Sequence, residues 1–134
     1  MKRGITTRCI SDRVRLGVAR HHAVVTDRMV QEGGTDIGCT SGELLLLAIG
    51  SCAAGGVSSY LQAQGCSPEN LSIAVFFEAH EDPRERDRII VSVSLDAAAR
   101  QLEPEAIRTA AVSGGVTSRM HAGTGLEVRM AAKT

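Results

Sequence analysis

The chain has 134 residues, of which 43% are hydrophobic and 22% are charged, the composition of a folded globular domain. Lysine plus arginine and aspartate plus glutamate each number 15, so the formal net charge is zero. A neutral chain with 2% aromatic residues lacks the basic surface and the stacking rings of nucleic-acid-binding proteins. The composition thus excludes disorder and nucleic-acid binding, and the length predicts one domain over residues 1–134.

The N-terminal third is predicted to hold two strands and a glycine-rich loop. Valine and leucine alternate with arginine and glycine between residues 13 and 19, which is the period of a half-buried strand. A second strand is expected at residues 22–26, before a turn at Asp27 and Arg28. Residues 33–38, Gly-Gly-Thr-Asp-Ile-Gly, form a loop by composition.

The longest predicted element is a helix over residues 43–64. The preceding Thr-Ser-Gly-Glu has the S/T-x-x-E pattern of a capping box, and Gly65 suits the C-terminal cap. The four leucines of its first turn leave no polar face, which indicates a helix buried on several sides. Gly55 and Gly56 lower helical propensity, so we expect another element, a partner or a substrate to approach the backbone there.

The C-terminal half is predicted to contain a hairpin, a helix and a final strand. Apolar residues occupy every second position over residues 71–79 and 89–95, and a charged loop joins the two segments. A helix is expected to begin near Pro104 and to be interrupted at residues 113–115, before a strand over residues 126–130. This order of elements predicts an α+β fold with an antiparallel sheet.

No membrane segment or secretion signal is expected. The most apolar stretch, residues 44–57, is shorter than the ~20 residues that a spanning helix needs. No apolar region follows the basic residues near the N-terminus, so the sequence predicts a cytoplasmic protein.

Four cysteines, at positions 9, 39, 52 and 66, are predicted to be free thiols in a reducing compartment. None forms a C-x-x-C pair, and none has a histidine at zinc-finger spacing. Neither a P-loop nor a dinucleotide fingerprint is present. We therefore expect no metal and no cofactor.

Cys52 is the thiol most suited to chemistry, although simple packing of a small side chain explains it as well. Gly55 and Gly56 share its helix face and would leave room beside the sulfur. Since Cys52 lies far from the helix start, activation would need a neighbour such as Arg15 or Arg20. Glu43 is either a catalytic acid or simply the acidic member of the capping box.

Residues 33–52 combine the loop Gly-Gly-Thr-Asp-Ile-Gly with the run Glu-Leu-Leu-Leu-Leu-Ala-Ile-Gly-Ser-Cys, which ends at Cys52. This combination resembles the signature of the OsmC/Ohr family, a GG-x-D-x-G loop followed by E-L-L-L-A-A-x-G-x-C. The order of the predicted elements fits that family along nearly the whole chain.

The resemblance implies an intertwined homodimer in which an antiparallel sheet wraps around a long central helix. The best-known members reduce organic hydroperoxides. A peroxidatic thiolate attacks the O–O bond, a second cysteine forms a disulfide with it, and an external thiol reductant reopens that disulfide. The peroxidatic cysteine matches Cys52.

The chain departs from the family pattern at the position of the second cysteine and just before the long helix. Gly114 stands at the position of the usual second cysteine. Glu43 is one residue away from the position of the catalytic glutamate in the hydroperoxide-resistance branch, and Ser41 and Gly42 replace the usual proline. These departures predict impaired resolution of an oxidised Cys52.

Three functions follow as alternatives. The first is a thiol-dependent hydroperoxide reductase in which Cys39, Cys66 or an external thiol resolves Cys52. The second is a non-catalytic dimer that binds a small apolar ligand. The third is a redox sensor that stops at the sulfenic acid of Cys52.

Overall fold

A computed structural model describes residues 4–123 and 126–131 of the chain, which forms two compact units. The first unit ends at Leu45 and the second begins at Leu46. Helix α1 (Ser41–Ala63) therefore starts in the first unit and continues in the second. The prediction of one domain over residues 1–134 stays a prediction.

The first unit contains an antiparallel sheet of three strands in the order β1 (Thr6–Cys9), β2 (Arg15–Ala19) and β3 (His22–Thr26). Leu16 at the centre of the sheet lies opposite Arg8 on one side and Val25 on the other. The predicted strands are confirmed as β2 and β3. The sequence analysis missed β1, because Thr-Thr-Arg-Cys carries no apolar alternation.

Asp27 organises the glycine-rich loop that follows β3. This aspartate is only 4% exposed, and its carboxylate accepts the backbone N–H groups of Arg28 at 2.7 Å and of Thr35 at 3.0 Å. It also accepts the hydroxyl of Thr35 at 2.5 Å and the N–H of Ile37 at 3.3 Å. These donors stabilise the charged form, led by the Thr35 hydroxyl, and lower the pKa of Asp27 to about 2.

Two glycines let the same loop lie directly against the backbone that leads into it. A Cβ at Gly34 would come within 1.9 Å of the carbonyl oxygen of Arg28, and one at Gly38 within 2.3 Å of that of Val25. Cys39 then forms an isolated parallel bridge with Thr26. The glycine-rich motif therefore has a structural role, which is close packing of backbone on backbone.

The second unit is a three-stranded sheet with helices. Its sheet has the order β4 (Ser72–Glu78), β5 (Arg88–Ser94) and β6 (Leu126–Met130). A short 3-10 helix η2 (Ala99–Gln101) precedes the helices α2 (Pro104–Val112) and α3 (Gly115–Gly123).

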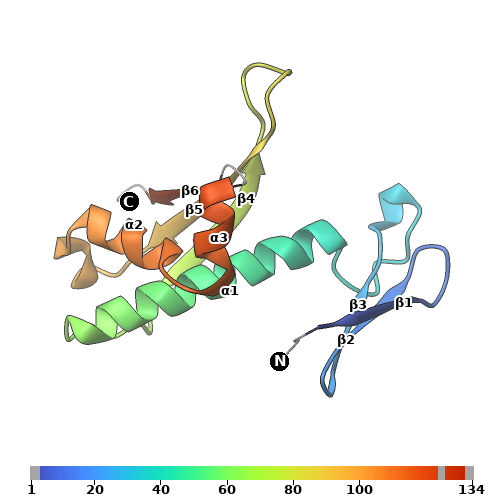
Figure 1. Cartoon of the computed structure of the whole chain (residues 1–134), viewed down its shortest axis with the longest axis horizontal. Helices are drawn as coiled ribbons and strands as arrows, with labels where there is room; N and C mark the ends of the chain where they lie inside the picture. Colours follow the sequence, from blue (N-terminus) through green and yellow to red (C-terminus); the bar gives the residue numbers. More distant parts are fainter. Residues whose placement is uncertain (1–3, 124–125, 132–134) are drawn as a thin grey trace. The chain divides into compact units, whose positions relative to one another are not determined.

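The sheet of the second unit is mixed, and the prediction of an antiparallel sheet is wrong at β6. Strands β4 and β5 form the predicted antiparallel hairpin, but β6 pairs with β5 in parallel. The reason is the connection between them, because α2 and α3 return the chain to the end of the sheet where β5 began (Figure 1).

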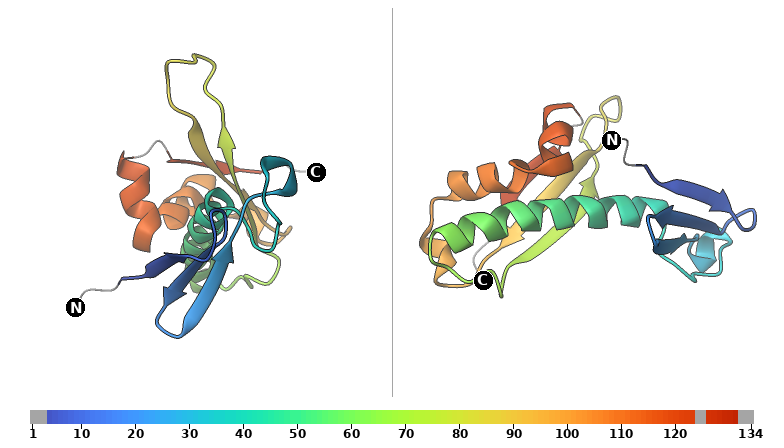
Figure 2. Two further views of the ribbon diagram at one scale, coloured as in Figure 1. Left: turned by 90° about the vertical axis from the view of Figure 1, so that its right-hand side faces the viewer. Right: turned by 60° about the horizontal axis from the view of Figure 1, so that its bottom comes forward.

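The core of the second unit lies between one face of this sheet and the helices. Figure 2 shows α1, α2 and α3 together with the sheet that they pack against. Helix α1 contributes a stripe of four residues at i, i+4 spacing, and α2 contributes the predicted apolar stripe. The buried residues of these stripes are Ile49, Ala53, Val57 and Leu61 in α1 and Ile107, Ala110 and Ala111 in α2.

Both predicted caps of α1 are present. At the start, the N–H of Glu43 donates to the hydroxyl of Thr40 at 3.1 Å. At the end, Gly65 adopts a left-handed conformation with φ of 73°, and the N–H of Cys66 donates to the carbonyl of Leu61 at 2.8 Å. This bond belongs to a Schellman motif, which ends the helix and fixes the position of Cys66.

One side of α1 is apolar and exposed, so the chain by itself does not bury the helix on several sides at its first turns. Leu45 is 43% exposed and Leu47 is 63% exposed. The helix is also longer than its most apolar stretch, and by length and composition alone it could cross a membrane. The core helices of soluble proteins can be equally long and apolar. In α1, however, only the stripe from Ile49 to Leu61 is buried.

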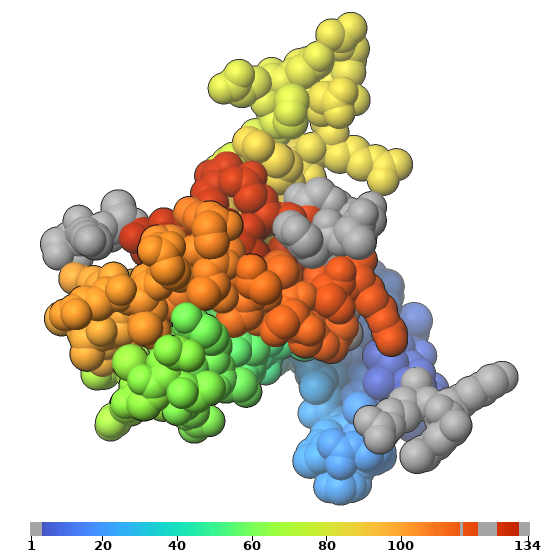
Figure 3. Space-filling view, turned by 60° about the vertical axis from the view of Figure 1, so that its left-hand side comes forward, coloured from blue at the N-terminus to red at the C-terminus, as the bar shows by residue number. Residues whose placement is uncertain are grey.

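Another helix approaches α1 closely at Gly56, as the glycines had predicted. A Cβ at Gly56 would lie 2.1 Å from the carbonyl oxygen of Ala110 in α2, whereas a Cβ at Gly55 would meet nothing within 4 Å. The space-filling view shows α2 directly against the C-terminal part of α1 (Figure 3). Gly56 thus sets the distance between the two helices.

Two substitutions test this contact. Gly56→Ala forces α1 and α2 apart, and we expect it to lower the free energy of unfolding by about 1–3 kcal/mol. Gly42→Ala adds the same methyl group in the first turn of α1, where the nearest atom is 3.9 Å away, and should raise it by up to about 1 kcal/mol. Urea denaturation of both variants measures the difference, and equal effects would contradict the close contact at Gly56.

A second prediction concerns Asp27. Because its pKa is about 2 in the folded protein and 3.8 ordinarily, the charged form stabilises the fold above pH 4, and this stabilisation is lost as the pH falls toward 2. Asp27→Asn should therefore lower the free energy of unfolding at pH 6, and the gap to wild type should narrow between pH 4 and pH 2. Chemical denaturation across that range measures the gap, and a gap independent of pH would refute the role of the charge.

Candidate functional site

Cys52 lies on α1 at the edge of the buried stripe, beside the junction of α2 and α3. Its neighbour Ala53 is fully buried, and Cys52 itself is half-buried. The nearest feature across from it is Gly115, the first residue of α3, where an added Cβ would lie 3.8 Å from the Cys52 Sγ. The thiol therefore faces the α2–α3 junction, which we define as residues 113–115.

The space beside the sulfur lies at the junction and at Gly55. A Cβ added at Gly114 or at Gly55 would meet no atom within 4 Å. A Cβ added at Gly115 would meet only the sulfur of Cys52. The predicted room at Gly56 is absent, because the carbonyl of Ala110 occupies it. The described residues of the second unit therefore leave Cys52 open toward the junction as well as toward Gly55.

The residue that faces Cys52 is thus Gly115, one position after Gly114, where the family resemblance places a second cysteine. Gly115 has φ of 56°, a left-handed conformation that favours glycine over other residues. The hydroxyl groups at and just after the junction are hydrogen-bonded to nearby backbone carbonyls. Ser113 donates its hydroxyl to the carbonyl of Ala110 at 2.7 Å, and Thr117 donates to the carbonyl of Gly114 at 2.8 Å.

The other candidate catalytic residues lie in the first unit, whereas Cys52 lies in the second. Glu43 is exposed, and its N–H takes part in the helix cap. Arg15 is half-buried in β2, and Arg20 is exposed at the turn between β2 and β3 with φ of 58°. The approach of any of these residues to Cys52 stays a prediction.

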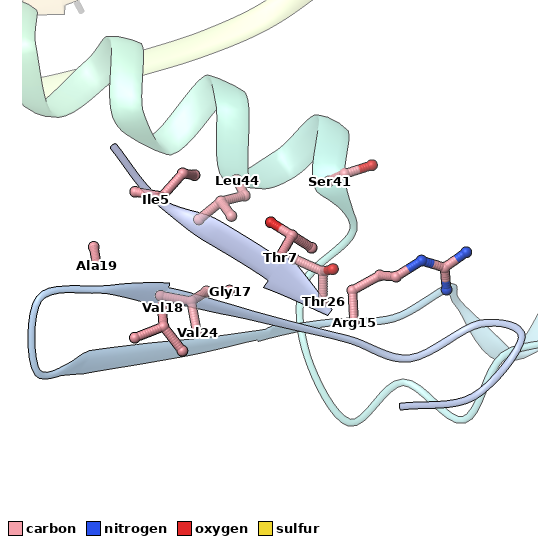
Figure 4. A pocket seen from close by; sticks show the side chains of 10 residues that line it. All are labelled: Ile5, Thr7, Arg15, Gly17, Val18, Ala19, Val24, Thr26, Ser41 and Leu44. Atoms are coloured by element: carbon pink, nitrogen blue, oxygen red, sulfur yellow. The ribbon is translucent and has the colours of Figure 1, made fainter. Parts of the chain in front are cut away.

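The first unit has a cavity of about 370 Å³ between its sheet and the start of α1. Figure 4 shows the polar lining residues toward one end and most of the apolar ones toward the other. Arg15 lies at the polar end, and no ion pair of Arg15 is present among the described residues. The lining residues are Ile5, Thr7, Arg15, Gly17, Val18, Ala19, Val24, Thr26, Ser41 and Leu44.

Comparison with solved structures assigns the fold. An OsmC-like protein of unknown function from Vibrio cholerae superposes with a TM-score of 0.71 at 8% identity, covering 98% of this chain and 99% of that one. An OsmC-like protein from Mycoplasma pneumoniae gives 0.67 at 12% identity, with 98% and 95% covered. The chain has the OsmC/Ohr fold. The organic hydroperoxide resistance protein of Bacillus subtilis shares it with a TM-score of 0.64, at 13% identity and 98% coverage of both chains.

The likeness to OsmC/Ohr proteins is one of structure. No family sequence model matches the chain, and no curated protein matches it by sequence. At these identities the superpositions show the fold, and the chemistry of the site has to be argued from its residues.

Within this OsmC/Ohr fold, the remaining thiols are dispersed. Cys9 is exposed, and Cys39 and Cys66 are half-buried like Cys52. Cys66 follows the Schellman end of α1, and Cys39 lies in the first unit. Among the described residues, no group of three or more histidine, cysteine or acidic side chains could hold a metal ion.

The sequence analysis missed two residues that are important to the candidate site and its scaffold. Asp27 was interpreted only as part of a turn, although the threonine, aspartate and isoleucine of the downstream loop follow at a spacing that its carboxylate can reach. Gly115 was interpreted as a helix interruption, and its contact with Cys52 joins residues far apart in the sequence.

Proposed function

We propose that the chain is a thiol-dependent hydroperoxide reductase in which Cys52 is the reacting thiol. The observation that supports this most directly is the half-buried Cys52 facing open glycine positions at the junction. A thiol packed only to fill the core would be enclosed by side chains, whereas Gly114 and Gly115 leave one side of Cys52 free. The OsmC/Ohr fold, which an organic hydroperoxide resistance protein shares, adds to this argument.

The reaction proceeds by nucleophilic displacement at oxygen. The thiolate of Cys52 attacks the terminal oxygen of ROOH, the O–O bond breaks, and RO⁻ leaves and takes a proton to become ROH. The sulfur is oxidised to a sulfenic acid, and the peroxide is reduced to an alcohol. A nearby cation would stabilise both the thiolate and the departing RO⁻, and Arg15 and Arg20 are the candidates for that role. Glu43 is the candidate for the catalytic acid that supplies a proton to the departing RO⁻.

The cavity of the first unit favours a second function, the binding of a small apolar ligand without catalysis. Its lining is apolar toward one end and carries Arg15, Thr7 and Thr26 toward the other. Such a cavity suits an apolar molecule with one polar group. Ligand binding that persists after Cys52→Ser, together with no consumption of hydroperoxide by wild type, would favour this alternative.

We also propose that a second copy of the chain covers the exposed side of α1. Ala48, Ser51 and Gly55 are exposed at helical spacing, next to Leu47. Small residues in this pattern let an identical helix pack at short distance about a two-fold axis. An exposed apolar side of this length is otherwise unusual for a soluble monomer. This arrangement gives the homodimer that the sequence resemblance implies.

The proposed activity predicts the effect of removing each thiol. Cys52→Ser should abolish consumption of cumene hydroperoxide by the pure protein with a dithiol reductant, because serine does not attack the O–O bond. Cys66→Ser is the matched control and should retain the wild-type rate, since Cys66 lies beyond the end of α1. Peroxide consumption can be followed by a colorimetric assay of residual hydroperoxide. If both variants consume peroxide like wild type, Cys52 is not the reacting thiol.

The dimer predicts a specific response to charge on α1. Leu47→Glu places a carboxylate on the exposed apolar side and should shift the protein from dimer to monomer at micromolar concentration. Gln101→Glu adds the same charge at an exposed polar site outside α1 and should leave the dimer intact. Light scattering coupled to gel filtration gives both masses. A wild-type monomer would rule out the dimer.

A further inference from the structure

The position that faces Cys52 decides how its oxidised form returns to the thiol. If Cys52 is the reacting thiol proposed above, its sulfenic acid needs a second sulfur within bonding distance. Two cysteines form a disulfide when their Cα atoms are within roughly 7 Å. Each thiol of the second unit can be tested against that limit.

Cys66 does not meet the limit. Its N–H is bonded to the carbonyl of Leu61, nine residues beyond Cys52 on a continuous helix. At 1.5 Å per residue, that bond lies about 13 Å along the axis from Cys52. A disulfide between Cys66 and Cys52 of the same chain would therefore require α1 to unwind.

No side chain of the α2–α3 junction fills the space in front of Cys52. Gly115 lies across from the sulfur, and its Cβ position is 3.8 Å from Sγ, an ordinary van der Waals distance. Gly114 beside it is also open. A thiol carried on a methylene group therefore fits where a cysteine side chain at position 115 would otherwise stand.

The three residues of the junction, Ser113, Gly114 and Gly115, carry no charged side chain that would select a particular thiol. Ser113 and Thr117 use their hydroxyls on the backbone carbonyls of Ala110 and Gly114. A Cβ at Gly114 would meet no atom within 4 Å, and one at Gly115 would meet only the sulfur of Cys52. The space therefore favours a small thiol over a protein thiol, whose backbone would have to enter between α1 and the junction.

We infer that a low-molecular-weight monothiol, entering over Gly114 and Gly115, resolves oxidised Cys52 in place of a second cysteine. This inference rests on the proposed function. The incoming thiol attacks the sulfur of the sulfenic acid, an S–S bond forms, and the hydroxyl leaves as water after taking the thiol proton. A second monothiol then attacks the mixed disulfide, which releases the Cys52 thiol and a symmetrical disulfide of the reductant. Two electrons pass from two monothiols to one hydroperoxide.

The first experiment follows Cys52 by intact-protein and peptide mass spectrometry. Wild-type protein receives one equivalent of cumene hydroperoxide and then either dimedone or 2-mercaptoethanol. Dimedone should label Cys52, which tests the proposed function separately. With 2-mercaptoethanol, the expected product is a mixed disulfide at Cys52. A Cys39–Cys52 or Cys9–Cys52 disulfide in its place would overturn the inference while leaving the proposed function intact.

Two cysteine variants test the position of the entering sulfur. Gly115→Cys places a sulfur across from Cys52, so an internal disulfide between Cys52 and the introduced cysteine should replace the mixed disulfide. Gly114→Cys is the matched control. Because the Cβ at position 114 does not face Cys52, the mixed disulfide with 2-mercaptoethanol should remain the main product in this variant. The reverse result would show that the entering thiol does not use the Gly115 position.

A third measurement does not depend on peroxide or on the strained backbone of Gly115. Exchange with 2-hydroxyethyl disulfide forms the same mixed disulfide on reduced Cys52. Gly114→Leu should slow this exchange about tenfold or more by filling the entry, and Gln62→Leu on α1 should not. An unchanged rate in Gly114→Leu would overturn the entry route. A different outcome is also informative. If Cys52 undergoes exchange but is not labelled by dimedone after peroxide treatment, the peroxidase proposal is refuted, and the resolving role of the monothiol is refuted with it.

Discussion

The backbone contact between α1 and α2 is the constraint on which the second unit depends. Because Gly56 has no side chain, the carbonyl of Ala110 can lie against α1, and the two helices can share one core with the sheet. Ala110 lies two residues before the end of α2, so the same contact brings the α2–α3 junction beside α1, near Cys52. The packing distance of two helices therefore determines the surroundings of the thiol, which lies one turn away from Gly56 on α1.

The sheet of the second unit is held on its other face by charged side chains. Arg129 of β6 pairs with Glu78 of β4 at 2.8 Å and with Glu127 at 2.8 Å, while Arg88 of β5 also pairs with Glu78 at 2.8 Å. Hydrogen bonding from Arg129 is the largest of the effects that lower the pKa of Glu78. These pairs join all three strands beside the buried Ile90, so they help to keep the parallel strand β6 in register.

In the first unit, a single carboxylate has a comparable organising effect. Asp27 gathers the donors of a loop that would otherwise leave several backbone N–H groups unpaired, and Gly34 and Gly38 allow the loop to close on itself. The motif through which the chain resembles OsmC/Ohr proteins is therefore largely a folding motif. The proposed reacting thiol, Cys52, stands at the end of the run, in the part of α1 that belongs to the second unit.

The sequence by itself determined the strands β2 to β6, the long helix with both caps and the prominence of Cys52, because each depends on local periodicity or a short motif. The parallel pairing of β6 came only from the tertiary structure, since pairing depends on where the intervening helices return the chain. The contact of Gly115 with Cys52 and the gathering of loop donors at Asp27 likewise join residues that are distant in sequence or ordinary in type. A glycine's role depends on what approaches it, so only the fold could distinguish Gly56, which is packed, from Gly55, which is open.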